Sequence, residues 1–137
     1  MISGVSLSPR RRRYQLYFQL QLENLHTVEV AEFLVALLRQ IPGPVIVVWD
    51  NTTIHRGPVI AEVLARFPRL ELVALPGYAP ELNPDEGVWR HTKARLANGR
   101  PDTVWKLVNQ VVDALTHLQH TPALLRSCLA HADLPLR

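Results

Sequence analysis

Two acidic residues in the middle of the chain have the setting and spacing that metal-dependent phosphodiester chemistry requires. Asp50 directly follows an apolar run rich in Val and Ile, Val45–Trp49, and Glu86 follows a loop at residues 76–80. The first carboxylate is therefore expected at the end of a buried strand, and the second in the first turn of a helix. Two carboxylates placed in this way can share divalent cations, which cut and join phosphodiester bonds.

Each of the two acidic residues also has an ordinary structural interpretation. Asp50 and Asn51 form an Asp-Asn pair, which is common in turns that follow strands. Glu86 stands three residues after Asn83, and this spacing fits a capping box in which the Glu86 carboxylate bonds to the backbone amide at the helix N-terminus. Either residue alone therefore indicates local structure as much as catalysis.

Neighbouring residues add further candidates for binding. His55 follows Asp50 by five positions, and it could orient a carboxylate, contact a phosphate or hydrogen-bond nearby backbone. Glu86, Trp89 and Lys93 fall on one face of the expected helix, because they stand at positions i, i+3 and i+7. This face would carry a carboxylate, an aromatic ring and a cation, although core packing is the ordinary interpretation of Trp89.

The composition is that of a single globular domain with a mild excess of positive charge. The 137 residues are 47% hydrophobic and 20% charged, which is typical of folded domains. There is no apolar stretch long enough to span a membrane, no secretion signal and only one cysteine, so we expect a cytoplasmic protein. The net charge of +3 favours polyanions. A basic run could hold a nucleic-acid backbone or form a solvated hairpin tip: Arg10, Arg11, Arg12 and Arg13.

The order of the expected elements predicts an α/β fold with a mixed sheet flanked by helices. Two β-prone runs at residues 2–8 and 14–21 predict a hairpin that turns at Ser8-Pro9. A helix follows with Thr27 as its N-cap, and the run at 45–49 is typical of a strand covered on both faces. The remaining elements are a helix from Pro58, a strand at 70–75, a helix from Pro84 capped by Asn83, a long helix after Asp102 or Thr103, and a last helix after Thr121.

Two motifs taken together resemble those of a known family. Asp50-Asn51-x-x-x-His55 is followed by Tyr78-Ala-Pro-x-Leu-Asn-Pro-x-Glu86-x-x-Trp89-x-x-x-Lys93, with 35 residues between the two acids. This arrangement resembles the catalytic half of DDE transposases. The closest group is the mariner-like transposases of bacterial insertion sequences, often described as DDE superfamily endonucleases. The ordered pair at this spacing is specific, and the resemblance extends over nearly the whole chain.

The resemblance implies a ribonuclease-H-like fold of the DDE and integrase type, and a function in DNA transposition. Asp50 and Glu86 would be the second and third catalytic acids and would hold Mg²⁺ or Mn²⁺. Asn51 and His55 would shape the metal loop, Asn83 would support the helix that carries Glu86, and Lys93 would face DNA. The DNA partners would be transposon ends and a target, and a bacterial cytoplasm would be the location.

The chain also departs from the family pattern. The family's first catalytic aspartate lies on a central strand before the hairpin that opens this chain, and residues 1–137 contain no counterpart. We therefore expect a single, N-terminally truncated catalytic domain that lacks the first central strand. Alone it would be inactive or very weak, and its metal binding weak or absent. Unpaired sheet edges would favour self-association or pairing with an upstream transposase fragment.

Two other functions are compatible with the same residues. One is a noncatalytic nucleic-acid-binding or assembly module that completes an upstream fragment, whose DNA binding would depend on the basic run and not on the two acids. The other is a structural α/β fold in which Asp50 serves only a turn and Glu86 only a helix cap. Manganese would not change the thermal stability of that third kind of protein.

Overall fold

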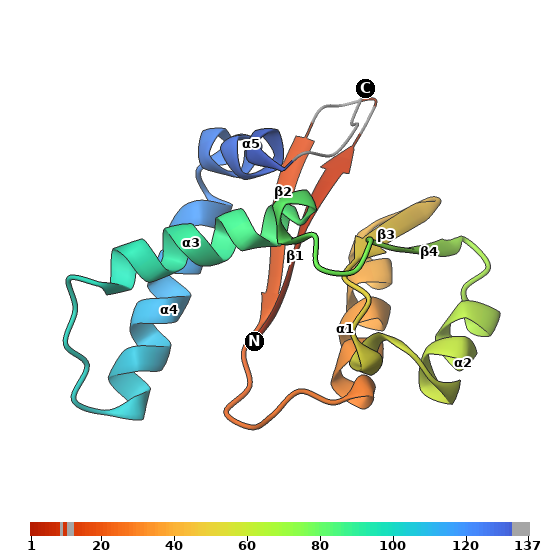
Figure 1. The fold of residues 1–137 in the computed structure, drawn as a ribbon, viewed down its shortest axis with the longest axis horizontal. Helices are drawn as coiled ribbons and strands as arrows, with labels where there is room; N and C mark the ends of the chain where they lie inside the picture. The colour runs from red at the N-terminus through yellow and green to blue at the C-terminus, as the bar shows by residue number, and fades with distance from the viewer. Residues whose placement is uncertain (9, 11–12, 133–137) are drawn as a thin grey trace. The chain divides into compact units, whose positions relative to one another are not determined.

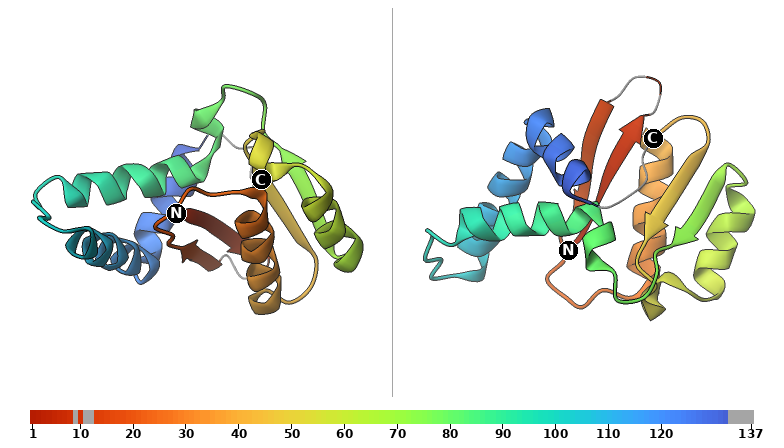
Figure 2. Two further views of the ribbon diagram at one scale, coloured as in Figure 1. Left: turned by 90° about the horizontal axis from the view of Figure 1, so that it is seen from below. Right: turned by 45° about the horizontal axis from the view of Figure 1, so that its top comes forward.

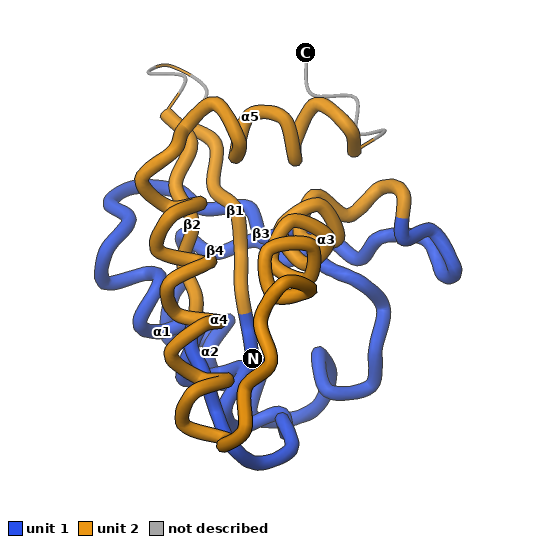
Figure 3. The backbone as a smooth tube through the Cα atoms, turned by 90° about the vertical axis from the view of Figure 1, so that its left-hand side faces the viewer, with its two compact units in different colours: residues 1–2, 19–80 blue, residues 3–18, 81–137 orange. Residues whose placement is uncertain are grey.

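The computed structural model describes residues 1–8, 10 and 13–132 of the 137-residue chain. Figure 1 shows its helices and strands, and Figure 3 colours its two compact units separately. Unit 1 contains residues 1–2 and 19–80, and unit 2 contains residues 3–18 and 81–137. Each unit is thus built from two stretches that are far apart in the sequence. The sequence prediction of a single domain stays a prediction.

Unit 1 is a parallel strand pair covered by two helices. Helix α1 (Thr27–Gln40) leads into strand β3 (Val45–Trp49), and helix α2 (Pro58–Arg66) leads into strand β4 (Leu70–Ala74). The strands lie side by side in parallel, as Figure 2 shows, with Val45 opposite Leu70 and Trp49 opposite Ala74. Parallel neighbours need a crossover between them, which α2 supplies. The core is formed by buried residues of both helices and of β4: Val30, Ala31, Leu34, Leu38, Ile60, Val63 and Leu70.

Strand β3 is covered on one face only, which corrects the sequence prediction. Val45, Val47 and Trp49 pack against the core, whereas Ile46 is 64% exposed and Val48 45% exposed. Side chains alternate between the two faces of a strand, and α1 and α2 both contribute to the core on the first face. The run at 45–49 is apolar on both faces, so its composition could not reveal that the described residues leave one face open.

Unit 2 combines three helices with most of the other strand pair. Strands β1 (Ile2–Ser8) and β2 (Arg13–Gln19) form the second two-stranded sheet among the described residues. The helices are α3 (Pro84–Leu96), α4 (Val104–Gln119) and α5 (Pro122–His131). Their fully buried side chains, together with one from β2, form the core of the unit: Leu16, Val88, Thr92, Leu115, Leu118 and Leu125.

The expected elements are all present in the expected order, with small shifts at their ends. The second strand is Arg13–Gln19 where residues 14–21 were expected, and the N-cap of α1 is His26 where Thr27 was expected. The backbone amide of His26 donates to Glu29 Oε2 at 2.8 Å. This hydrogen bond makes His26 the N-cap, one residue before the expected position. The four strands form two separate pairs within the described residues. In the described part of the chain, no helix is long and apolar enough to cross a membrane.

Arg69 ties the end of α1 to the start of β4. Its guanidinium donates to the backbone carbonyl oxygens of Ile41 at 2.7 Å and Gly43 at 2.6 Å, and also to that of Leu38. The last carbonyls of a helix have no partner inside the helix, so a cation that reaches them acts as a distant C-cap.

Replacing Arg69 with Met should lower the free energy of unfolding by about 2 kcal/mol, because charge-assisted hydrogen bonds to three carbonyls, two of them partly buried, are lost. Urea denaturation measures the change. Arg39→Met is the matched control, since Arg39 is an exposed residue in the last turn of the same helix, and its effect should stay within about 0.5 kcal/mol. Equal effects of the two substitutions would contradict a capping role for Arg69.

Candidate functional site

Asp50 lies at the edge of unit 1 where both strands end. Strand β3 finishes at Trp49, which is paired with Ala74 at the end of β4, and the Leu75 amide donates to the Trp49 carbonyl at 2.7 Å. Ligand sites of open α/β sheets collect at such carboxyl ends. The Asp50 side chain is 52% exposed, so its carboxylate is accessible to a ligand.

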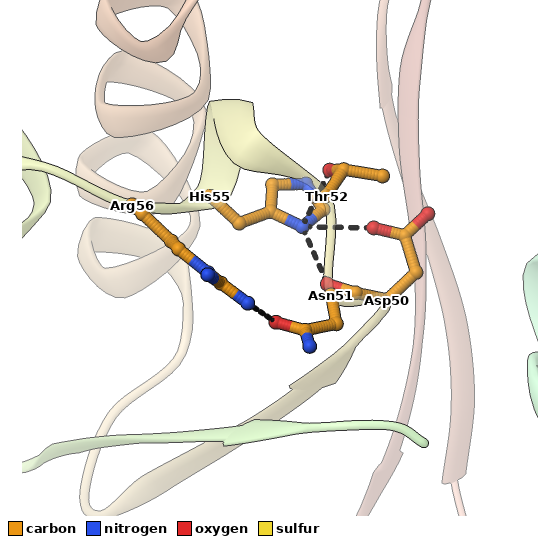
Figure 4. A network of polar contacts seen from close by, with 5 residues as sticks. All are labelled: Asp50, Asn51, Thr52, His55 and Arg56. Atoms are coloured by element: carbon orange, nitrogen blue, oxygen red, sulfur yellow. Dashed lines mark hydrogen bonds and ion pairs between the residues drawn. The ribbon is translucent and has the colours of Figure 1, made fainter. Parts of the chain in front are cut away.

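His55 holds the Asp50 carboxylate in place (Figure 4). Its Nδ1 atom lies 2.9 Å from Asp50 Oδ1, 2.8 Å from the Asp50 carbonyl oxygen and 3.2 Å from Thr52 Oγ1. With the carboxyl group ionised, both of these Asp50 oxygen atoms are acceptors and cannot donate. The arrangement therefore assigns the proton to Nδ1 of His55. His55 therefore has two of the three roles that the sequence allowed, because it binds local backbone and orients a carboxylate.

The imidazole ring of His55 is fixed from a second side by Trp49. The two rings are stacked, with centroids 4.3 Å apart and planes 4° from parallel. The sequence places Trp49 at the end of the strand but gives no sign of this contact, which forms because the 3₁₀ turn Thr53–His55 brings the ring back over the strand end. Stacking and hydrogen bonding together restrict the rotation of His55, and hence the orientation of Asp50.

Asn51 is held by Arg56, a residue that the sequence analysis missed. The Arg56 guanidinium donates a hydrogen bond to Asn51 Oδ1 (Figure 4). Both residues line an open hollow of about 290 Å³ together with Asp50, His55 and Trp49. The available signal was the five-residue spacing between Asn51 and Arg56, equal to that between Asp50 and His55. The loop thus places a carboxylate, an imidazole and a guanidinium around one hollow.

Glu86 stands in the first turn of α3, in unit 2, and its carboxylate is available. The Asn83 side chain accepts from the Asp85 amide at 3.1 Å, which confirms Asn83 as the N-cap. Asp85 is occupied, since both of its carboxylate oxygens lie within 2.8 Å of the Ser3 hydroxyl. The Glu86 side chain is exposed and makes no hydrogen bond or ion pair with any described residue. The capping-box interpretation of Glu86 therefore does not hold.

The remaining candidates lie mainly on the surface of unit 2. Lys93 is exposed on α3, and Trp89 is partly buried on the same helix. Arg10 and Arg13 are exposed, whereas Arg11 and Arg12, like Pro9 in the expected turn, lie outside the described residues.

The structure thus gathers Asp50, Asn51 and His55 at one strand end, and Asn83, Glu86 and Lys93 on one helix. That Asp50 and Glu86 converge on a common cation stays a prediction, since they belong to different units. Among the described residues, no group of three or more His, Cys, Asp or Glu side chains could hold a metal ion.

Comparison with known families decides the identity of the chain. The model of the DDE superfamily endonucleases matches residues 7–107, a range that includes Asp50, Glu86 and Lys93. The chain belongs to the DDE superfamily endonuclease family. No curated protein sequence matches this DDE superfamily endonuclease.

Solved structures of the Mos1 mariner transposase share its fold. The crystal structure of the Mos1 catalytic domain aligns with a TM-score of 0.59 at 19% identity, and covers 85% of this chain and 66% of the Mos1 chain. The Mos1 catalytic domain with raltegravir and magnesium aligns with a TM-score of 0.62 at 15% identity, and covers 97% and 82%. The form with raltegravir and manganese aligns with a TM-score of 0.58 at 17% identity, and covers 88% and 70%.

These likenesses establish a ribonuclease-H-like α/β fold for this DDE superfamily endonuclease, as the sequence predicted. The chain spans just under two thirds of the length of the first of these Mos1 chains.

Proposed function

We propose that this chain supplies two metal-binding carboxylates, Asp50 and Glu86, to a DDE transposase catalytic domain that cleaves DNA and transfers strands. The observation that carries the proposal is that both carboxylates are exposed and follow the family's motif order, within a range matched by the family model. The similar Mos1 catalytic domain has been solved with manganese and with magnesium. That likeness supports the same class of cation here.

The donor chemistry of the two residues fits such a cation. Mg²⁺ and Mn²⁺ prefer carboxylate oxygens, and Asp50 Oδ2 and both oxygens of Glu86 make no hydrogen bond with the described residues. His55 holds Asp50 Oδ1 at 2.9 Å and so fixes the direction in which Oδ2 is presented. When bound, the metal would activate the attacking hydroxyl and stabilise the leaving oxygen of a phosphodiester.

We also propose that a third carboxylate comes from a polypeptide segment outside these 137 residues, and that residues 1–137 alone have little or no activity. In support, the family motifs in residues 1–137 supply two acids, Asp50 and Glu86. Strand β3 is hydrogen-bonded to β4 alone among the described strands, so its other edge is unpaired within them, and Ile46 and Val48 on its open face are exposed. Such an edge favours pairing with a further strand, either from an upstream transposase fragment or from a second copy.

The proposed partner is DNA, in the form of transposon ends and target, in a bacterial cytoplasm. Arg10, Arg13 and Lys93 are exposed cations of unit 2, and we assign Arg11 and Arg12 to the same DNA contact. Cations that neutralise phosphates release counterions, so binding of this kind weakens steeply with salt. A noncatalytic binding module would show the same salt dependence, and only the role of the two acids separates it from the catalytic proposal.

Nicking of a fluorescent DNA duplex by the 137-residue chain tests the proposal. We expect salt-dependent binding that weakens when Arg10–Arg13 are replaced with Gln, and trace nicking that requires manganese and is lost in Asp50→Asn. Trace nicking that persists in Asp50→Asn would contradict the catalytic role. DNA binding that is unchanged in Asp50→Asn and Glu86→Gln, together with no effect of manganese on the parent chain's DNA binding or melting temperature, would favour the noncatalytic module. Binding that does not change with salt would remove both.

A further inference from the structure

Tyr78 is the most exposed large apolar residue described, and it lies in the same unit as Asp50. It stands in the loop that follows β4, four residues after Ala74, which pairs with Trp49 at the end of β3. Its exposure is 106% of the reference value for tyrosine. The loops after β3 and β4 begin at the carboxyl ends of two neighbouring parallel strands. The loop that carries Tyr78 and the loop that carries Asp50 therefore start next to each other.

The backbone of Tyr78 adopts a conformation that tyrosine rarely takes. Its φ angle is +58°, and among the described residues it alone combines a side chain with a positive φ. The left-handed region is sterically unfavourable for a bulky residue, whereas Gly and Asn occupy it readily. Strained backbone of this kind persists where a side chain is needed in one particular place, and it concentrates at functional sites.

No contact within the described structure explains the ring. Tyr78 has no hydrogen bond and no ring contact there, and its neighbours Pro76, Gly77 and Pro80 are exposed as well. A side-chain carbon added to Gly77 would meet nothing within 4 Å, so the space beside the loop is open. A ring that is fully exposed buries no surface against the described residues, and it is available to a planar ligand.

We propose that the Tyr78 ring stacks on an unpaired base of the DNA strand bound at the Asp50 edge of unit 1. A base presents a flat π-face that tyrosine can cover whatever the sequence, which is how proteins hold single-stranded segments without reading them. The cation of Arg56 lies in the Asp50 loop, where it suits the phosphates that flank such a base. This assignment rests on the proposed function, because it requires that DNA is the ligand.

Replacement of Tyr78 by Asn separates the binding role from a structural one. Asn tolerates a positive φ, so the melting temperature of Tyr78→Asn should equal or exceed that of the parent chain. Affinity for a fluorescent single-stranded oligonucleotide should fall about tenfold to hundredfold, the range that one stacked base contributes. Tyr78→Phe should bind as the parent does. Trp105→Ala, which removes a 68% exposed aromatic from unit 2, should change neither quantity.

The stacked base is identified with oligonucleotides that carry 2-aminopurine or an abasic residue at successive positions. At one position, 2-aminopurine fluorescence should be quenched by the parent chain and not by Tyr78→Asn, and an abasic residue there should remove the difference between the two proteins. Parent and Tyr78→Asn affinities that agree within twofold would overturn the assignment and leave the proposed function standing. A parent chain that binds neither single-stranded nor duplex DNA would overturn both.

Discussion

Manganese should raise the melting temperature of the parent chain and leave that of the Asp50→Asn variant unchanged. An amide oxygen carries no charge and is a far weaker ligand than a carboxylate for a hard cation. A ligand at about 100 times its dissociation constant stabilises the folded state by about 2.7 kcal/mol, and Asp50→Asn should lose all of this. Thermal unfolding followed by tryptophan fluorescence, over a manganese titration, measures the loss.

The same titration tests whether Asp50 and Glu86 bind one cation. If they do, Glu86→Gln should lose the stabilisation as Asp50→Asn does, and the double variant should lose no more than either single variant. Effects of residues that act on one ligand are not additive, whereas those of independent sites are. Full stabilisation of Glu86→Gln by manganese would show that the two carboxylates do not share a metal.

Two further variants bracket the expected size of the effect. His55→Ala should weaken manganese binding about 10- to 100-fold, the usual cost of losing a group that orients a metal ligand. Its effect should therefore be smaller than that of Asp50→Asn. Glu81→Gln is the matched control for both acids, because Glu81 is an exposed carboxylate in the 3₁₀ turn just before α3. Its manganese response should equal that of the parent.

The sequence predicts the helix starts of this protein well because their causes are local. Asn83 caps α3 and Pro84 begins it, and Pro58 and Pro122 stand at the first positions of α2 and α5. A cap hydrogen bond and a proline ring affect the backbone within three residues, so the local sequence is enough to predict where the helix begins. The prediction for α1 was one residue late because Glu29 bonds to His26, a residue that is not a common N-cap.

Features that depend on distant residues were not predictable in the same way. Ile46 and Val48 are as apolar as Val45 and Val47, and only the packing of α1 and α2 decides which face is covered. The helix cap supplied by Arg69 joins residues up to 31 positions apart. Such contacts have no local pattern, because they depend on which elements the whole fold brings together.

The candidate site shows the same division. The positions of Asp50 and Glu86 after a strand and at a helix start followed from periodicity and breakers, and the structure agrees. The contacts that make Asp50 oriented and Glu86 available could not be predicted from the sequence pattern. Ser3, which occupies Asp85 and leaves Glu86 as the available carboxylate of that turn, lies 82 positions away. The stacking of Trp49 on His55 is local, yet a five-residue loop can adopt too many conformations for this contact to be predicted from its sequence.

Gly87→Val should lower the free energy of unfolding by about 3 kcal/mol, which is the upper part of the range for overpacked cores. Helices α3 and α5 meet at Gly87, where an added Cβ would lie 2.9 Å from Cys128 Cβ and 3.1 Å from its backbone Cα. Cys128 is buried, and burial raises the pKa of its thiol. The obstructing atoms include backbone, so a rotamer change cannot relieve the contact, and one helix must move. Urea denaturation measures the loss.

Gly87→Ala should be damaging through the same contact, and Cys128→Gly should relieve it. Removing the Cys128 side chain takes away the atom nearest to the new Cβ, so the Gly87→Ala and Cys128→Gly double variant should be more stable than the sum of the single effects predicts. Gly77→Ala is the control, since a Cβ at Gly77 meets nothing within 4 Å. It should be neutral or stabilise by up to about 1 kcal/mol, because alanine restricts the unfolded chain. Strictly additive effects of Gly87→Ala and Cys128→Gly would mean that α3 and α5 do not approach each other this closely.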